Sequence, residues 1–184
     1  MPARPDSQLD GYDLLLREIR RNLSRHLDVI VFVDGDRGSG KSSLSLRLAW
    51  DIDPLWRKRP DLAANAFTIF SPMEYVLLVA YLLRGGDSLY RGRFVVYEEA
   101  GATGTLGSAA AVQNMRSTLE VMRQWQICLI INLPLKERMR DLMYEVAHFS
   151  IWSYRSDHEQ QVILARWKQR YRDEQRVAFV NPML

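Results

Sequence analysis

The sequence predicts an α/β protein built as a three-layer sandwich, in which helices cover a mainly parallel sheet. Apolar runs of strand length alternate along the chain with longer segments of helical period, an order typical of parallel sheets. Several of these runs are continuously apolar, as are strands buried on both faces. The 184 residues include 47% hydrophobic and 26% charged residues, a composition typical of a globular domain. We therefore expect one domain with a single core.

The first predicted element is an amphipathic helix over Tyr12–Leu27. Its apolar residues recur at three- and four-residue spacing, and arginines occupy much of the remaining surface. This is the period of a helix with one buried face. We expect residues 1–28 to form an N-terminal segment whose helix packs on the core, and residues 29–184 to form the main domain.

A buried strand over Val29–Val33 is expected next, followed by a glycine-rich turn and a helix over Lys41–Asp51. Residues 53–66 contain two prolines and show no clear period. They are predicted to form a surface loop. A short strand is expected at Phe67–Phe70.

A helix-start signature opens the middle of the chain at Ser71-Pro72-Met73-Glu74. The serine can cap the helix, the proline suits its first position, and the glutamate follows three residues after the cap. This helix should end near Arg84. Further helices are expected over residues 112–123 and 136–147, and further strands over residues 94–98, 127–132, 148–154 and 161–167. The last of these strands is predicted to be antiparallel.

Neither a membrane protein nor a secreted one is indicated. The longest uninterrupted apolar run, Tyr75–Leu83, is much shorter than the roughly 20 residues that span a bilayer. The polar residues 1–13 lack the apolar core of a signal peptide. Cys128 is the single cysteine, so no disulfide can form within the chain, and its apolar neighbours predict a buried thiol. We expect a cytoplasmic protein without a membrane span.

The strongest motif is Gly35-Asp-Arg-Gly-Ser-Gly-Lys41-Ser42, which satisfies the pattern G-x-x-x-x-G-K-S/T between a predicted strand and a predicted helix. Its glycines allow a tight turn whose backbone N–H groups surround a phosphate chain. Lys41 would reach the β- and γ-phosphates, and the Ser42 hydroxyl can bind Mg²⁺. The residues predicted to bind the nucleotide are Gly35, Asp36, Arg37, Gly38, Ser39, Gly40, Lys41, Ser42 and Ser43.

Two carboxylates, Glu98 and Glu99, stand at the C-terminal end of the predicted strand that begins at Phe94. Ligands gather at this end of the strands in open α/β sheets. We expect Glu98 to hold Mg²⁺ and Glu99 to polarise the attacking water as general base. Alternatively, the two acids are exposed residues of a strand-to-loop turn.

Together these residues resemble the P-loop ATPases of the additional-strand, catalytic-glutamate group, which have a RecA-like fold. The glycine-rich motif corresponds to Walker A, Glu98 and Glu99 to Walker B, and Asn132 to the polar sensor. The resemblance covers about Val29–Tyr154 and makes residues 29–184 a P-loop ATPase domain. It implies ATP and Mg²⁺ as cofactors and the strand order 5-1-4-3-2, with the C-terminal antiparallel strand added. Glu98 departs from the pattern, because the group usually has aspartate there.

Within this group, three segments are most similar to small FtsK/HerA-type ATPases: Glu98–Gly101, Asn114–Arg123 and Ile130–Pro134. These ATPases include viral and plasmid enzymes that translocate or package DNA. The resemblance implies a homo-oligomeric ring that acts on double-stranded DNA, in the cytoplasm or inside an infected host cell. It also implies that a neighbouring subunit supplies an arginine to the γ-phosphate. We expect this arginine to be Arg123, and the further candidates are Arg116, Arg138, Arg140 and Arg155.

The basic and aromatic residues of Arg166–Arg172 suit a nucleic-acid surface, although a strand or helix with solvated arginines gives the same string. Two other functions also remain open. A small-molecule or nucleoside kinase has the same loop motif and a similar length. An ATP-dependent switch acting on a protein partner would use the same site without moving DNA.

Overall fold

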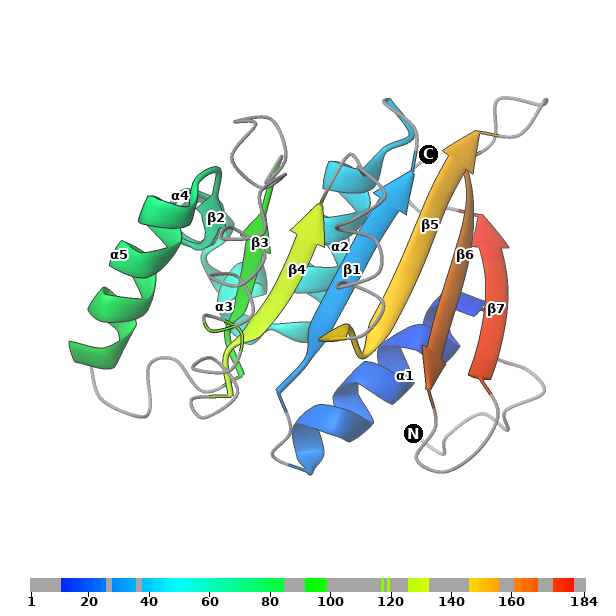
Figure 1. Ribbon diagram of the computed structural model, residues 1–184, viewed down its shortest axis with the longest axis horizontal. Coiled ribbons are helices and arrows are strands. Elements are labelled where there is room, and N and C mark those ends of the chain that lie inside the picture. The colour runs from blue at the N-terminus through cyan, green and yellow to red at the C-terminus, as the bar shows by residue number, and fades with distance from the viewer. Residues whose placement is uncertain are drawn as a thin grey trace.

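A single sheet organises the part of the chain that the computed structural model describes. That part comprises residues 11–25, 28–35, 38–84, 92–98, 117, 119, 126–132, 146–155, 161–168 and 174–180. The strands are β1 (Ile30–Gly35), β2 (Thr68–Ile69), β3 (Phe94–Tyr97), β4 (Cys128–Asn132), β5 (Phe149–Arg155), β6 (Gln161–Lys168) and β7 (Glu174–Val180). They lie in the order β2-β3-β4-β1-β5-β6-β7 (Figure 1). The first five are mutually parallel, which confirms an α/β fold.

The complete strand order differs from the expected one, because two strands instead of one follow the parallel part. Strand β6 pairs antiparallel with β5, and β7 pairs antiparallel with β6. Strand β7 was not predicted, because it begins with Glu174, Gln175 and Arg176 and its apolar run is limited to its last four residues, 177–180. Part of the expected nucleic-acid segment, up to Lys168, belongs to β6, and residues 169–172 lie outside the described residues.

The described helices are α1 (Gly11–Ser24), α2 (Lys41–Ile52), α3 (Pro54–Lys58), α4 (Pro60–Phe67) and α5 (Pro72–Arg84). Helix α2 packs against β1, β3 and β4, and α1 packs against α2 and β7, so both cover the same side of the sheet. Helix α5 lies beside the β2 edge (Figure 1). Of the helices expected in the second half of the chain, only residues 117, 119, 146 and 147 are described; the first three are helical and residue 147 is not.

Residues 53–66 form most of two short helices, α3 and α4, which Arg59 separates, and the loop expected there is wrong. Asp53 caps α3 by accepting a hydrogen bond from the Leu55 amide at 2.8 Å, and prolines open both α3 and α4. Proline suits the first helical turn, since its missing N–H has no partner there. The two helices are too short to show a clear period. Trp56 anchors them to the sheet, because its buried indole donates to the Phe94 carbonyl at 3.0 Å.

The core follows the continuously apolar strands. All five residues of β4 and the first five of β1 are buried, as expected for strands covered on both faces. The Cys128 thiol is fully buried, as predicted, and burial raises its pKa. Helix α1 adds Leu15 and Ile19 to the core, and the Tyr12 hydroxyl donates to Asp51 Oδ2 at 2.8 Å. None of the described helices could cross a lipid bilayer.

Candidate phosphate-binding site

A tight turn joins β1 to α2 at the glycine-rich motif. Gly38 and Gly40 have φ angles of 77° and 79°, in the left-handed region that glycine adopts without strain. Gly40 is the N-cap residue of α2 and its carbonyl accepts from the Leu44 amide at 3.0 Å. The loop therefore leads directly into a helix N-terminus, which favours anions. Asp36 and Arg37 lie outside the described residues.

Gly35 is needed for a different reason, the close approach of a neighbouring strand. Its φ is 142°, and a Cβ atom placed on it would lie 1.9 Å from the Ser153 carbonyl oxygen of β5. Gly35 is also the last residue of β1 that pairs with β5, where its partner is Ser153. Any side chain at this position would separate the two strands.

Lys41 is the first residue of α2, and its ammonium donates to the Gly35 carbonyl at 2.8 Å. The contact brings the lysine charge back across the loop to the end of β1. Ser42 and Ser43 follow, and both are exposed. The predicted cation and hydroxyl thus lie together at the N-terminus of α2.

The predicted metal carboxylate and sensor meet at the ends of two neighbouring strands. Tyr97 of β3 pairs with Ile131 of β4, so the next residues, Glu98 and Asn132, lie at the same level. Asn132 Nδ2 donates to Glu98 Oε1 at 2.6 Å. Ser42 Oγ donates to the other carboxylate oxygen, Oε2, at 2.8 Å. Glu98 is 7% exposed and Asn132 is 2% exposed, so this polar contact is held in the protein interior.

Ser45 extends this cluster and was not among the predicted site residues. It is fully buried in α2, and its hydroxyl donates to Asn132 Oδ1 at 2.6 Å. Because the amide oxygen accepts from Ser45, the amide nitrogen faces Glu98. The signal available in the sequence is weak: Ser45 lies three residues after Ser42, on the same face of a helix.

Ser153 also contacts the loop and was not predicted. Its buried hydroxyl donates to the Ser39 carbonyl at 2.6 Å. The two residues are 114 positions apart, and no local pattern in the sequence connects them.

The Ser42 and Glu98 side chains fit a magnesium ion. Their Oγ and Oε2 atoms are 2.8 Å apart, and both are hard oxygen donors. Mg²⁺ commonly takes one or two protein oxygens and completes its shell with water and phosphate oxygens. A cluster of three or more His, Cys, Asp or Glu residues is not found in the described parts of the chain, and a nucleotide-bound magnesium does not require one.

Several expected site residues cannot be placed. Glu99 and Arg123 lie outside the described residues, as do Arg116, Arg138 and Arg140. Arg155 is the last residue of β5. The general base and the arginine supplied by a neighbour therefore stay predictions.

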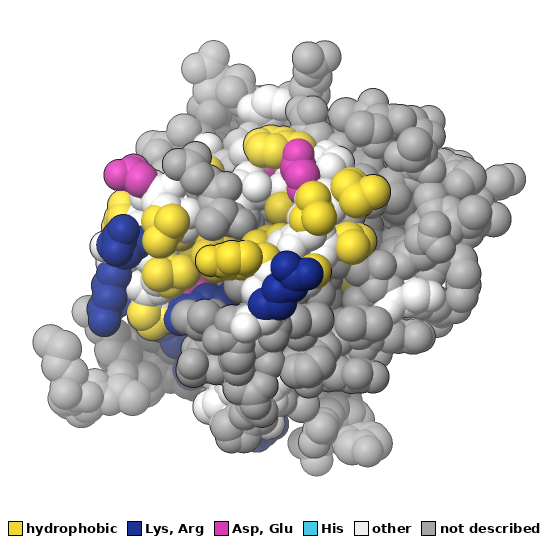
Figure 2. Space-filling model, turned by 90° about the vertical axis from the view of Figure 1, so that its left-hand side faces the viewer, with side chains coloured by type: hydrophobic (Ala, Val, Ile, Leu, Met, Phe, Trp, Pro, Cys, Tyr) yellow, Lys and Arg dark blue, Asp and Glu magenta, His cyan; other side chains and the backbone are white. Residues whose placement is uncertain are grey.

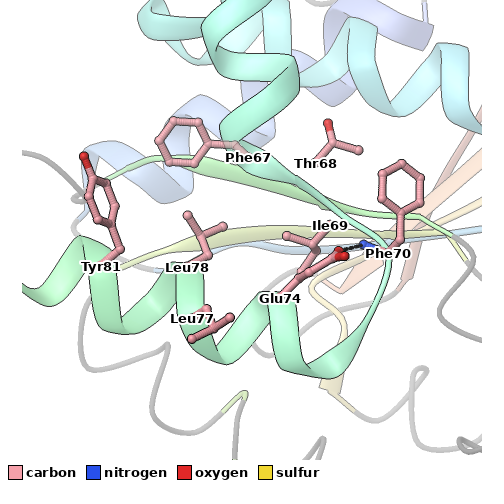
Figure 3. A pocket seen from close by; sticks show the side chains of 8 residues that line it. All are labelled: Phe67, Thr68, Ile69, Phe70, Glu74, Leu77, Leu78 and Tyr81. Atoms are coloured by element: carbon pink, nitrogen blue, oxygen red, sulfur yellow. Dashed lines mark hydrogen bonds between the residues drawn. The ribbon is translucent and has the colours of Figure 1, made fainter.

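A groove, the β2-edge groove, lies between β2 and α5 and has a volume of about 540 Å³. The residues that line it are Phe67, Thr68, Ile69, Phe70, Glu74, Leu77, Leu78 and Tyr81 (Figure 3). Hydrophobic side chains gather on this face of the molecule (Figure 2), with Leu77 62% and Tyr81 72% exposed. Among the described residues of the lining Glu74 contributes the one charged group, and its carboxylate accepts from the Phe70 amide at 2.7 Å.

The groove and the polar cluster lie at neighbouring strands, β2 and β3. The Glu98 amide donates to the Ile69 carbonyl of β2 at 2.8 Å, so Glu98 stands between the two regions. The described residues that line the groove include no lysine or arginine, whereas Lys41 lies on the loop side.

The comparisons with known proteins add no relative: no protein-family model matches the chain, and no curated protein matches it. The functional interpretation depends on the motif and on the geometry of the site.

Proposed function

We propose that the chain binds ATP with Mg²⁺ and hydrolyses it. The observation that carries this proposal is the contact of Glu98 with both Ser42 and Asn132. It joins the loop motif to the ends of two neighbouring strands, where open α/β sheets bind their ligands. A chance glycine turn would not bring a buried carboxylate to the serine of its own motif.

Each described residue has a role that its position supports. The loop amides and the N-terminus of α2 would bind the phosphates, and Lys41 would neutralise charge on the β- and γ-phosphates. Ser42 and Glu98 would hold Mg²⁺, which supplies charge neutralisation at the bridged phosphate oxygens. Asn132 would hold the Glu98 carboxylate in place and stand close to the reacting phosphate.

Two roles fall to residues beyond the described parts of the chain. Glu99 would act as general base toward the attacking water. Arg123 of a neighbouring subunit would stabilise the charge that spreads over the γ-phosphate in the transition state, an effect worth roughly 10³ to 10⁵ in rate. The ring assembly is part of the proposal for this reason.

We further propose that hydrolysis drives translocation or packaging of double-stranded DNA, in the manner of RecA-like ATPases of the FtsK/HerA kind. Read from β5, the five parallel strands follow the order β5-β1-β4-β3-β2, the order that this group shares. The net charge of +3 is compatible with a polyanionic partner. The setting would be the cytoplasm or an infected host cell.

Phosphate release from ATP, measured with and without long duplex DNA at several protein concentrations, tests the whole proposal. A ring motor releases phosphate without a second substrate, is stimulated by DNA, and gains specific activity as the concentration rises. A kinase releases no phosphate and consumes ATP only after a small acceptor is added. A switch turns over slowly and ignores DNA.

A further inference from the structure

We propose that Ser153 of β5 is a positioning residue for the phosphate loop, an inference that rests on the proposed nucleotide binding. Its hydroxyl donates to the Ser39 carbonyl at 2.6 Å, and the contact is buried. Ser39 is the fifth residue of the motif that begins at Gly35. The contact therefore fixes a peptide group within the loop from a strand that contributes no residue to the motif.

The contact with Ser153 sets the orientation of the peptide group between Ser39 and Gly40. The Ser39 carbonyl faces β5, where Ser153 holds it. In a planar trans peptide the following N–H points the opposite way from the carbonyl, so the Gly40 N–H is directed away from β5. That N–H stands at the N-terminus of α2, where amides lack partners within the helix and are free to bind an anion. Ser153 thereby keeps the carbonyl oxygen, which repels phosphate, on the outer side of the loop.

The backbone of β5 is fixed at the same place by an independent contact. Gly35 pairs with Ser153 at the end of the parallel ladder, and the Ser153 carbonyl lies where a Cβ atom of Gly35 would stand. One residue of β5 thus holds both the first and the fifth residues of the loop. The two contacts therefore hold the loop against β5 at Gly35 and at Ser39.

The test measures the dissociation constant for ATP with Mg²⁺ in the full chain. Ser153→Ala removes the hydroxyl, and Ser150→Ala in the same strand is the matched control, because Ser150 pairs with Phe32 well before the loop. Loss of one hydrogen bond predicts about 3- to 10-fold weaker ATP binding for Ser153→Ala. Ser150→Ala should bind as the wild type does.

Kinetics separate positioning from general damage. Because the groups assigned to chemistry remain, Ser153→Ala should raise KM by a similar factor and change kcat by less than about 2-fold. Ser153→Thr, which keeps a hydroxyl on Cβ and suits a strand, should restore most of the ATP affinity; Ser153→Cys, close in volume but a weak donor, should not. These variants also serve if Ser153→Ala is poorly folded.

Unchanged ATP binding by both Ser153→Ala and Ser153→Cys, alongside a wild type that binds ATP, would overturn this inference alone. The inference would also be overturned if Ser150→Ala lost as much ATP affinity as Ser153→Ala, or if Ser153→Thr and Ser153→Cys bound ATP with equal affinity. Failure of the wild type itself to bind ATP would overturn the proposed function, and the two failures are thus distinguishable.

Discussion

The two sides of Glu98 differ in the kind of surface that they present. On one side its carboxylate joins Ser42 and Asn132 through bonds of 2.8 and 2.6 Å. On the other side its amide bonds to Ile69, behind which the β2-edge groove exposes apolar side chains such as Leu77. The loop side is built from directional polar groups, whereas the groove offers apolar area.

The two regions differ in the groups that phosphate and metal binding would need. Phosphate and metal recognition needs oxygen donors, N–H groups and a cation in fixed positions, and only the loop side combines them among the described residues. An apolar groove can contribute contact area, but its single carboxylate, Glu74, already accepts a bond from the neighbouring backbone. Substitutions on the two sides should therefore have different effects.

The largest difference is expected between Lys41→Ala and Leu77→Ser. Lys41→Ala removes the cation at the start of α2 and should weaken ATP binding and abolish phosphate release. Leu77→Ser changes an exposed groove residue and should leave phosphate release within about 2-fold of the wild type. Both are measured by steady-state phosphate release; retained turnover in Lys41→Ala would refute the assignment of the loop.

A large kinetic effect is also expected from Glu99→Gln. Loss of a general base should slow hydrolysis by about 10²-fold or more, while ATP and Mg²⁺ still bind. Single-turnover hydrolysis together with an ATP titration separates the two properties. Glu74→Gln in the groove is the matched control for loss of a carboxylate, and a comparable slowing in that variant would contradict the contrast between the two regions.

Ser45→Ala should have an intermediate effect on the loop side. It leaves the buried Asn132 Oδ1 without its donor, which costs about 1–3 kcal/mol of stability. The amide can then turn away from Glu98, and kcat should fall several-fold. Thermal unfolding and kcat are measured together, with Ser24→Ala as the control, since Ser24 is exposed and bonds only locally in α1. An unchanged kcat would show that the orientation of Asn132 does not matter.

How far the sequence predicts this structure depends on the range of the interactions involved. The parallel strands were located within two residues, because their continuous apolar runs follow from burial on both faces. The turn at Gly38 and Gly40 and the helix that begins at Lys41 were predicted correctly, because the motif has a fixed spacing; the roles of these residues stay predictions. The prolines at positions 54 and 60 favoured the prediction of a loop, but here they begin helices. Proline can end a helix or begin one, and its presence alone does not decide between the two.

The residues that were missed depend on contacts between distant segments. Ser45 gains its role only when α2 is placed over the end of β4, and Ser153 only when β5 pairs with β1 up to Gly35. Neither has a motif of its own. The apolar run from Phe94 predicts that Tyr97 is buried, but not that its hydroxyl lacks a hydrogen-bond partner among the described residues.

Tyr97→Phe should give the smallest effect. The Tyr97 hydroxyl is buried without a hydrogen-bond partner in the described structure, so its removal should raise the free energy of unfolding by about 1 kcal/mol. Burial, with a smaller contribution from the charge of Glu74, raises the pKa of Tyr97 to about 12.

The same substitution has a pH signature. In the unfolded chain the phenol loses its proton near pH 10, whereas the folded chain keeps it up to about pH 12. The free energy of unfolding of the wild type should therefore fall as pH rises from about 10 to 12. In Tyr97→Phe, which lacks this phenol, the free energy of unfolding should fall less over the same range. Denaturant unfolding at pH 8, 10 and 11 measures this; equal losses in both proteins would contradict the assigned burial.

ATP affinity measured as a function of Mg²⁺ concentration tests whether Ser42 and Glu98 hold the magnesium of a bound ATP. The wild type should bind ATP tightly only when Mg²⁺ is present. Glu98→Gln should require about 10-fold or more Mg²⁺ to reach the same affinity, since it loses a charged ligand. Leu77→Ser should follow the wild-type curve. Identical Mg²⁺ curves for the wild type and Glu98→Gln, or ATP binding that ignores Mg²⁺ in the wild type, would contradict the account.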